Sequence, residues 1–147
     1  MPLAACAPTV PLEAAPEANS VACAEISVRL PQTIGELDRR STNAQATAAW
    51  GEPTAVIYRC GLPDLGPSDL PCFDVDGVDW LLDESDAPQY VFTTYGPTTE
   101  VIVDITYIAG ADAVRAISGA VAATPAEARC LATTDVFGGG TVAPETE

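Results

Sequence analysis

The side chains best suited to chemistry in this sequence are carboxylates in the acidic segment DVDGVDWLLDE, which begins at Asp74. Its Asp-Gly dipeptide favours a two-residue type I′ hairpin turn, and that register places Asp74 directly opposite Asp79 on the outer face of a sheet. Because like charges are destabilising there, one interpretation is a Ca²⁺ site completed by Asp76 or Asp83. The alternative, which we favour, is a pair of solvated carboxylates, since the segment departs from the EF-hand pattern. We therefore predict no metal site.

The only basic cluster is Arg39-Arg40. Its two guanidinium groups can hold a phosphate, or the carboxylate of a partner, through bidentate hydrogen bonds. The alternative is a pair of arginines at a helix end, next to the acidic residues Glu36 and Asp38.

The sequence lacks the residues that several common kinds of catalytic and metal-binding site require. There is no histidine, which excludes an imidazole base and a His-ligated metal. No serine lies in a G-x-S-x-G or S-x-x-K motif, and no Gly-rich phosphate loop precedes a helix. We therefore predict that the protein is not an enzyme and uses no cofactor.

The chain is strongly acidic. Asp and Glu number 21 against 6 basic residues, all arginine. The resulting net charge of −15 disfavours nucleic acid and anionic lipid surfaces as partners.

The first cysteine, Cys6, ends the stretch PLAAC, in which a leucine stands three positions earlier and small residues lie between. This pattern is typical of bacterial lipoproteins, whose cysteine becomes lipidated. Residues 1–5 are then the remnant of a lipoprotein signal whose charged and apolar regions lie upstream. The alternative is that Met1 is the native start, in which case there is no export and the pattern is a coincidence. We expect export and attachment to the outer face of the cell membrane through lipid on Cys6.

The remaining cysteines are even in number, as an oxidising compartment requires: Cys23, Cys60, Cys72 and Cys130. We predict a Cys60–Cys72 bridge, which closes a loop rich in glycine and proline, and a Cys23–Cys130 bridge, which joins the two ends of the domain. The alternatives are four reduced, buried thiols and a zinc site, and the spacing of the cysteines speaks against zinc.

The elements that position these side chains are predicted within residues 20–131, which form a single globular domain. Residues 6–19 are rich in proline and alanine and predict a flexible tether behind the lipidated cysteine. Residues 132–147 predict a disordered acidic tail.

Four helices are expected in this domain, two early and two late. One begins after Ser20 and places Cys23, Ile26 and Leu30 on one face, and a second covers residues 33–49. A third follows Gly110, with the apolar stripe Val114, Ile117 and Val121. A capping box at residues 124–127 then starts a short final helix that carries Cys130.

The sequence pattern in the middle of the domain predicts strands. AVIYRC at 55–60 is one strand, CFDVDGVDWLL at 72–82 is a hairpin, and the segments 89–95 and 98–107 form a second hairpin. In the last segment Val101, Val103, Ile105 and Tyr107 alternate with polar residues, which predicts one buried face. The order predicts an α+β fold, in which a roughly four-stranded antiparallel sheet is covered by the N- and C-terminal helices.

Several motifs occur in a specific order: CAPTV, LPQTIGELDRR, AAWGEPTAVIYRCG, DVDGVDW and YVFTTYG. In these the chain resembles the actinobacterial secreted lipoproteins called domain of unknown function 3515, over nearly all of residues 6–131. The resemblance implies a location at the cell envelope and no established chemistry.

The features together predict an envelope lipoprotein that acts as a non-catalytic interaction or accessory module. It would dock on an envelope or membrane protein at the outer face of the cytoplasmic membrane. The alternative is a small-molecule or cation-binding lipoprotein, whose site is the acidic hairpin or the Arg39-Arg40 pair. An exposed apolar patch favours the first function, and a pocket with convergent polar groups favours the second.

Overall fold

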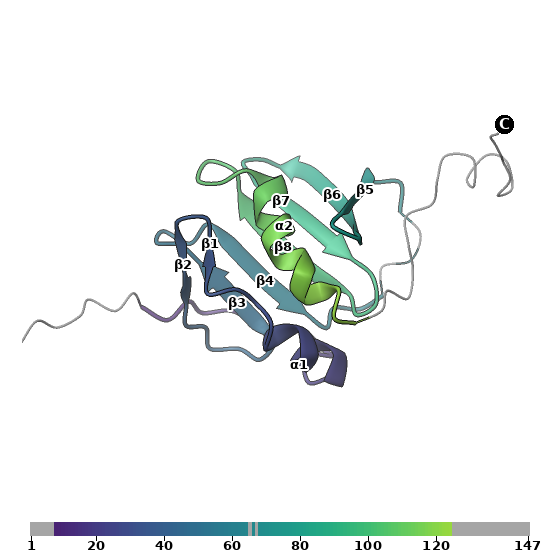
Figure 1. The fold of residues 1–147 in the computed structure, drawn as a ribbon, viewed down its shortest axis with the longest axis horizontal. Helices are drawn as coiled ribbons and strands as arrows, with labels where there is room; N and C mark the ends of the chain where they lie inside the picture. Colours follow the sequence, from purple (N-terminus) through teal and green to yellow (C-terminus); the bar gives the residue numbers. More distant parts are fainter. Residues whose placement is uncertain (1–7, 65, 67, 125–147) are drawn as a thin grey trace, which may run out of the picture.

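The structure is a computed structural model that describes residues 8–64, 66 and 68–124. Within these residues two helices accompany one antiparallel sheet of eight strands (Figure 1). The α+β class is thus confirmed, while the prediction of about four strands is too low. The elements in chain order are α1 (Val21–Ser27), β1 (Thr33–Ile34), β2 (Leu37–Arg40), β3 (Thr47–Trp50), β4 (Val56–Cys60), β5 (Cys72–Val75), β6 (Val78–Asp86), β7 (Gln89–Thr94), β8 (Thr99–Asp104) and α2 (Gly110–Val121).

The sheet consists of two antiparallel meanders joined at their last strands. Its order is β1-β2-β3-β4-β8-β7-β6-β5, so each meander runs from an edge of the sheet toward its centre. The two meet where β4 pairs with β8, with Val56 opposite Val103 and Cys60 opposite Thr99. The predicted strand at 55–60 and both predicted hairpins are confirmed.

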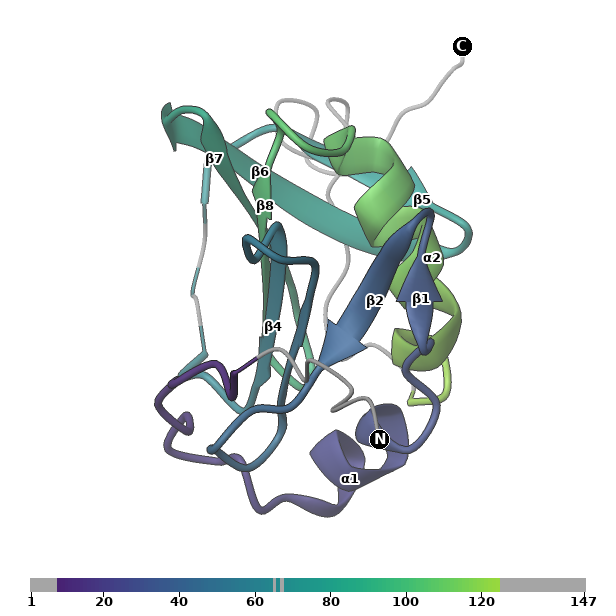
Figure 2. The same cartoon turned by 90° about the vertical axis from the view of Figure 1, so that its left-hand side faces the viewer.

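Helix α2 lies against the concave face of the sheet and forms the centre of the core. It contacts β8 in the middle of the sheet and also β1 and β5, the two edge strands, so the sheet curves around the helix (Figure 2). The predicted stripe Val114, Ile117 and Val121 is buried there. Full burial of an aliphatic side chain of this size contributes about 1.5–3 kcal/mol, so this stripe is a large part of what holds α2 in place.

Helix α1 forms as the sequence predicts. The hydroxyl of Ser20 accepts a hydrogen bond from the amide of Cys23 at 3.1 Å, which caps the first turn. Cys23 and Ile26 are buried on one face, and Leu30 is buried just beyond the helix. Helix α1 therefore adds its apolar face to the same core and contacts α2.

The helix predicted over 33–49 is wrong, because that segment supplies β1, β2 and most of β3. Positive φ angles at Gly35 (59°) and Ala46 (55°) turn the chain between these strands. The alanines that favour a helix are small enough to be buried in β3, where Ala48 and Ala49 are 1% and 0% exposed. Tertiary packing overrides helix propensity here.

The predicted cysteine pairing is also wrong. Cys23 is bonded to Cys60, with Cα atoms 5.7 Å apart. Alternation along β4 points Cys60 into the core, where Cys23 of α1 is also buried. Cys72 is disulfide-bonded as well. Its partner is not Cys60, and Cys130 with its predicted helix lies outside the described residues.

Strand β8 is shorter than predicted. It ends at Asp104, so the alternation that buries Val101 and Val103 does not continue. Ile105 and Tyr107 are 37% and 50% exposed in the connection to α2, which corrects their assignment to the buried face.

Candidate functional site

The outer face of the sheet, opposite α2, is crossed by the N-terminal segment 8–18, which we call the strap. Its first half lies beside the end of β2, where Val10 forms a parallel bridge with Thr42. The carbonyl of Pro8 accepts a hydrogen bond from Nη2 of Arg40 at 2.7 Å, and the amide of Val10 donates to the carbonyl of Ser41 at 2.9 Å. Val10 is buried. This docking corrects the tether predicted over 6–19, as far as residues 8–18 are concerned.

The second half of the strap is held over β4. Nε of Arg59 donates to the carbonyl of Glu13 at 3.0 Å, and its Nη1 forms an ion pair with Glu100 at 3.0 Å. The amide of Glu17 donates to the carbonyl of Gly61 at 2.8 Å. A Cβ atom on Gly61 would lie 2.4 Å from the carbonyl carbon of Glu17, so only glycine permits this close approach.

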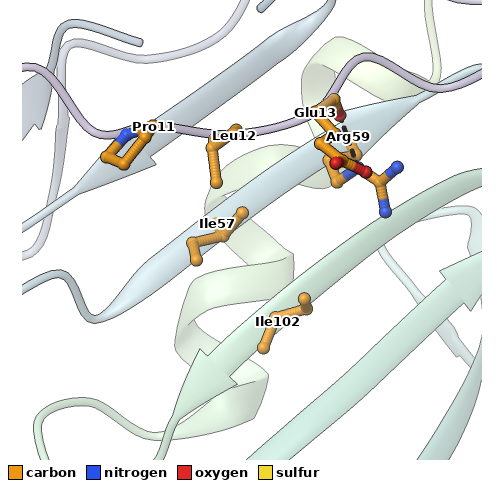
Figure 3. A pocket seen from close by; sticks show the side chains of 6 residues that line it. All are labelled: Pro11, Leu12, Glu13, Ile57, Arg59 and Ile102. Atoms are coloured by element: carbon orange, nitrogen blue, oxygen red, sulfur yellow. Dashed lines mark hydrogen bonds between the residues drawn. The ribbon is translucent and has the colours of Figure 1, made fainter. Parts of the chain in front are cut away.

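A hollow of about 420 Å³ lies between the strap and the outer face of the sheet (Figure 3). Ile57 of β4 and Ile102 of β8 are register partners and form its floor, and Leu12 of the strap stands beside them. All three side chains are only partly buried. The hollow can accept an apolar side chain, while Arg59 at its end is already neutralised by Glu100. Its lining residues are Pro11, Leu12, Glu13, Ile57, Arg59 and Ile102.

The sequence singled out none of these lining residues. Their signal is present but faint, because outward positions of β4 and β8 carry isoleucine where a solvated face normally carries polar residues. That Ile57 and Ile102 are adjacent depends on the long-range pairing of β4 with β8.

A second hollow, of about 360 Å³, contains the predicted pair Arg39 and Arg40. The pair lies on β2, so the alternative of a helix end is wrong. Successive residues of a strand point to opposite faces. Both arginines nevertheless line this hollow, together with Ser41 and Thr42, which directly follow β2. The remaining lining residues are polar: Gln32, Ser41, Thr42 and Thr47.

The acidic hairpin has the predicted register, with Asp74 opposite Asp79. Asp74 accepts a hydrogen bond from the amide of Gly77 at 2.9 Å and so supports the turn, and Asp79 also has an interaction partner. Hydrogen bonds from the side chain and the amide of Ser85 lower the pKa of Asp83. Local bonds thus account for Asp74 and Asp83, and in the described part of the chain no three His, Cys, Asp or Glu residues are placed to hold a metal ion.

The predicted lipidation site, Cys6, lies outside the described residues, two positions before Pro8. Among the described residues no helix has the length and apolar character needed to cross a membrane.

A comparison with known protein families gives a match over most of the chain. A family described as "Protein of unknown function (DUF3515)" matches residues 4–130. Neither a curated protein nor a solved structure matches the chain.

Proposed function

This chain belongs to the DUF3515 family of proteins of unknown function, and on that premise we propose that it is a lipoprotein of the cell envelope that acts as a non-catalytic interaction module. It is anchored through lipid on Cys6 to the outer face of the membrane, and it docks on an envelope or membrane protein. The disulfide Cys23–Cys60 supports this location, because such bonds persist in oxidising compartments.

The observation that carries the interaction role is the apolar hollow under the strap. Partly exposed isoleucines at the centre of a sheet face, bordered by polar groups, are typical of a surface that receives an apolar side chain from a partner. The chain carries a net charge of −15, so the partner surface around that apolar side chain is basic.

The strap supports the anchored arrangement in a second way. Because Arg40 holds Pro8, the reach of two residues limits the distance between the Cα atoms of a lipidated Cys6 and Pro8 to about 7 Å. The domain is therefore held close to the membrane, with the β2 side nearest to it. A docking partner is within reach only if it is itself a membrane protein or lies on the membrane surface.

Two measurements on the lipoprotein in its own membranes test this function. In the first, wild-type protein should fractionate with membranes, and Cys6→Ala should release it or block its processing. In the second, a photoreactive residue at position 102 should cross-link to a specific membrane protein. The matched control is the same residue at Ala111, which is exposed on α2 on the other side of the sheet.

The two parts of the proposal fail separately. The anchor is refuted if wild-type protein stays in the soluble fraction although Cys6 is confirmed to be present in the chain. Identical cross-links from positions 102 and 111, or Ile102→Asp protein that captures the same partner as wild type, refutes the outer face as the interaction surface.

A further inference from the structure

We propose that the hollow beside Arg39 and Arg40 is a binding site for a phosphate group. The site is distinct from the apolar hollow under the strap. Binding of a soluble phosphate compound there does not depend on the function proposed above. Its lining consists of Gln32, Arg39, Arg40, Ser41, Thr42 and Thr47.

The first argument is an uncompensated positive charge. In the part of the chain that the structure describes, Arg29, Arg59 and Arg115 each form an ion pair with a carboxylate. Arg39 and Arg40 form none with any described acidic residue, although the chain has 21 acidic residues against six arginines. Two arginines that line one hollow without a described counter-charge attract an anion and repel a cation.

The second argument concerns how Arg39 is held. Its guanidinium carbon lies 5.9 Å from the ring centroid of Trp50, a distance that suits a cation–π contact, and Trp50 is fully buried. Its described hydrogen bond, to the carbonyl of Leu30, is long at 3.5 Å. The guanidinium group thus lies against the ring of Trp50, while most of its five N–H donors stay available for a ligand.

Arg40 supplies charge rather than contacts. Its Nη1 donates to the carbonyl of Gly51 at 2.6 Å and to the hydroxyl of Thr54 at 3.0 Å, and its Nη2 donates to Pro8. Its Nε is buried and has no partner among the described residues. Arg40 is thus immobilised on the wall of the hollow by three hydrogen bonds.

The neutral donors of the hollow favour phosphate over a carboxylate. The hydroxyl of Ser41 and the amide of Gln32 are exposed beside Arg39, whereas Thr47 bonds to the hydroxyl of Thr42 at 2.8 Å and to the carbonyl of Ala44 at 2.6 Å, which makes that wall rigid. An arginine fork with additional hydroxyl and amide donors can engage three or more oxygens, which a phosphate presents and a carboxylate does not. The phosphate can belong to a soluble phosphoester or to a lipid head group near the anchor.

The test uses the 147-residue chain with its disulfides formed, at 150 mM salt so that the overall negative charge is screened beyond about 8 Å. One arm titrates inorganic phosphate and follows the amide NMR signals of residues 39–42. The other measures co-sedimentation with vesicles of phosphatidylcholine that contain phosphatidic acid, against vesicles of phosphatidylcholine alone. We expect saturable binding in at least one arm. Binding of inorganic phosphate identifies a soluble ligand, and binding to phosphatidic acid alone identifies a head group.

The variants decide whether the hollow is responsible. Arg39→Gln should weaken binding about ten-fold or more, as expected for a lost charge-assisted contact, and Ser41→Ala, which cannot disturb the stacking on Trp50, should weaken it by a smaller factor. Arg115→Gln makes the same change of charge on the exposed face of α2 and should leave binding unchanged. Absence of saturable binding in both arms, or equal losses in Arg39→Gln and Arg115→Gln, would overturn the proposal.

Discussion

The indole Nε1 of Trp80 donates a hydrogen bond to Oγ of Ser118 across 2.9 Å, inside the layer between β6 and α2. Both side chains are fully buried. Oγ of Ser118 in turn donates to the carbonyl of Val114 at 2.6 Å, so one hydroxyl serves both the indole and the helix backbone. This polar contact fixes the position of α2 along the second meander, because a hydrogen bond restricts sliding that apolar packing alone would permit.

Replacement of Ser118 by alanine tests this contact. Ser118→Ala leaves the indole N–H buried without an acceptor, and we expect the free energy of unfolding to fall by about 1–3 kcal/mol. Urea denaturation followed by tryptophan fluorescence measures the change. Ser41→Ala, at an exposed position, is the control and should stay within about 0.5 kcal/mol of wild type. Equal stabilities of the two variants would contradict the assignment.

The disulfide is tested by peptide mapping of the non-reduced protein. We expect a cross-linked peptide that joins Cys23 to Cys60, and a second that joins Cys72 to Cys130, since Cys6 carries lipid in the proposed function. The sequence separation of Cys23 and Cys60 is 37, and removal of that bridge in Cys23→Ala/Cys60→Ala should cost about 4 kcal/mol of stability in the loop-entropy treatment. A peptide that joins Cys60 to Cys72 would refute the arrangement.

Docking of the strap is tested by a pair of glycines. Gly61 and Gly77 both have positive φ angles, of 102° and 89°, but only at Gly61 would a Cβ atom collide with the strap. Gly77→Ala should therefore cost only the strain of the backbone, about 1–2 kcal/mol. Gly61→Ala should cost more and should also increase amide hydrogen exchange at Glu17, whose N–H bonds to Gly61. Similar exchange at Glu17 in both variants would show that the strap is not docked there.

Burial of Tyr58 makes stability depend on pH in the alkaline range. Desolvation raises the pKa of its hydroxyl far above 10, against smaller opposing effects of Ser27 and Arg39. Above pH 10 the unfolded chain loses this proton and the folded chain keeps it, so the contribution is complete below pH 10 and declines as pH rises, by about 1.4 kcal/mol per pH unit. Tyr58→Phe removes the group.

The measurement for Tyr58 is urea denaturation of wild type and Tyr58→Phe between pH 8 and 11. The difference in unfolding free energy between the two proteins should be constant below pH 9 and should grow in favour of Tyr58→Phe at higher pH. The other tyrosines contribute equally to both proteins, so they do not affect this difference. A constant difference over the whole range would refute the shift in pKa.

How far the sequence predicts this fold depends on whether a signal is local. The cap at Ser20, the Asp-Gly turn at 76–77 and the stripe on α2 each occupy a few consecutive residues, and each is confirmed. The segment 33–49 misleads because its alanines have high helix propensity, whereas what decides its structure is burial of β3 between β2 and β4.

The candidate sites follow the same rule. Arg39-Arg40 is a local motif and can be singled out from the sequence, although not the strand edge on which it lies. The apolar hollow cannot be predicted in this way, since Ile57, Ile102 and Leu12 come from three segments that only the tertiary structure brings together. The disulfide is a further case, because counting cysteines predicts oxidation but not which two thiols meet.

The joining of the two meanders at β4 and β8 also determines how the chain reaches its native state. Contacts within each meander are local, whereas β4 and β8 can pair only after the whole second meander has been synthesised, and closing that long loop costs entropy before any contact is made. We expect the folding rate to be limited by the pairing of β4 with β8, which we call the seam. Val103→Ala, within the seam, should slow refolding in stopped-flow experiments, while Val78→Ala, in the hairpin of β5 and β6, should mainly accelerate unfolding.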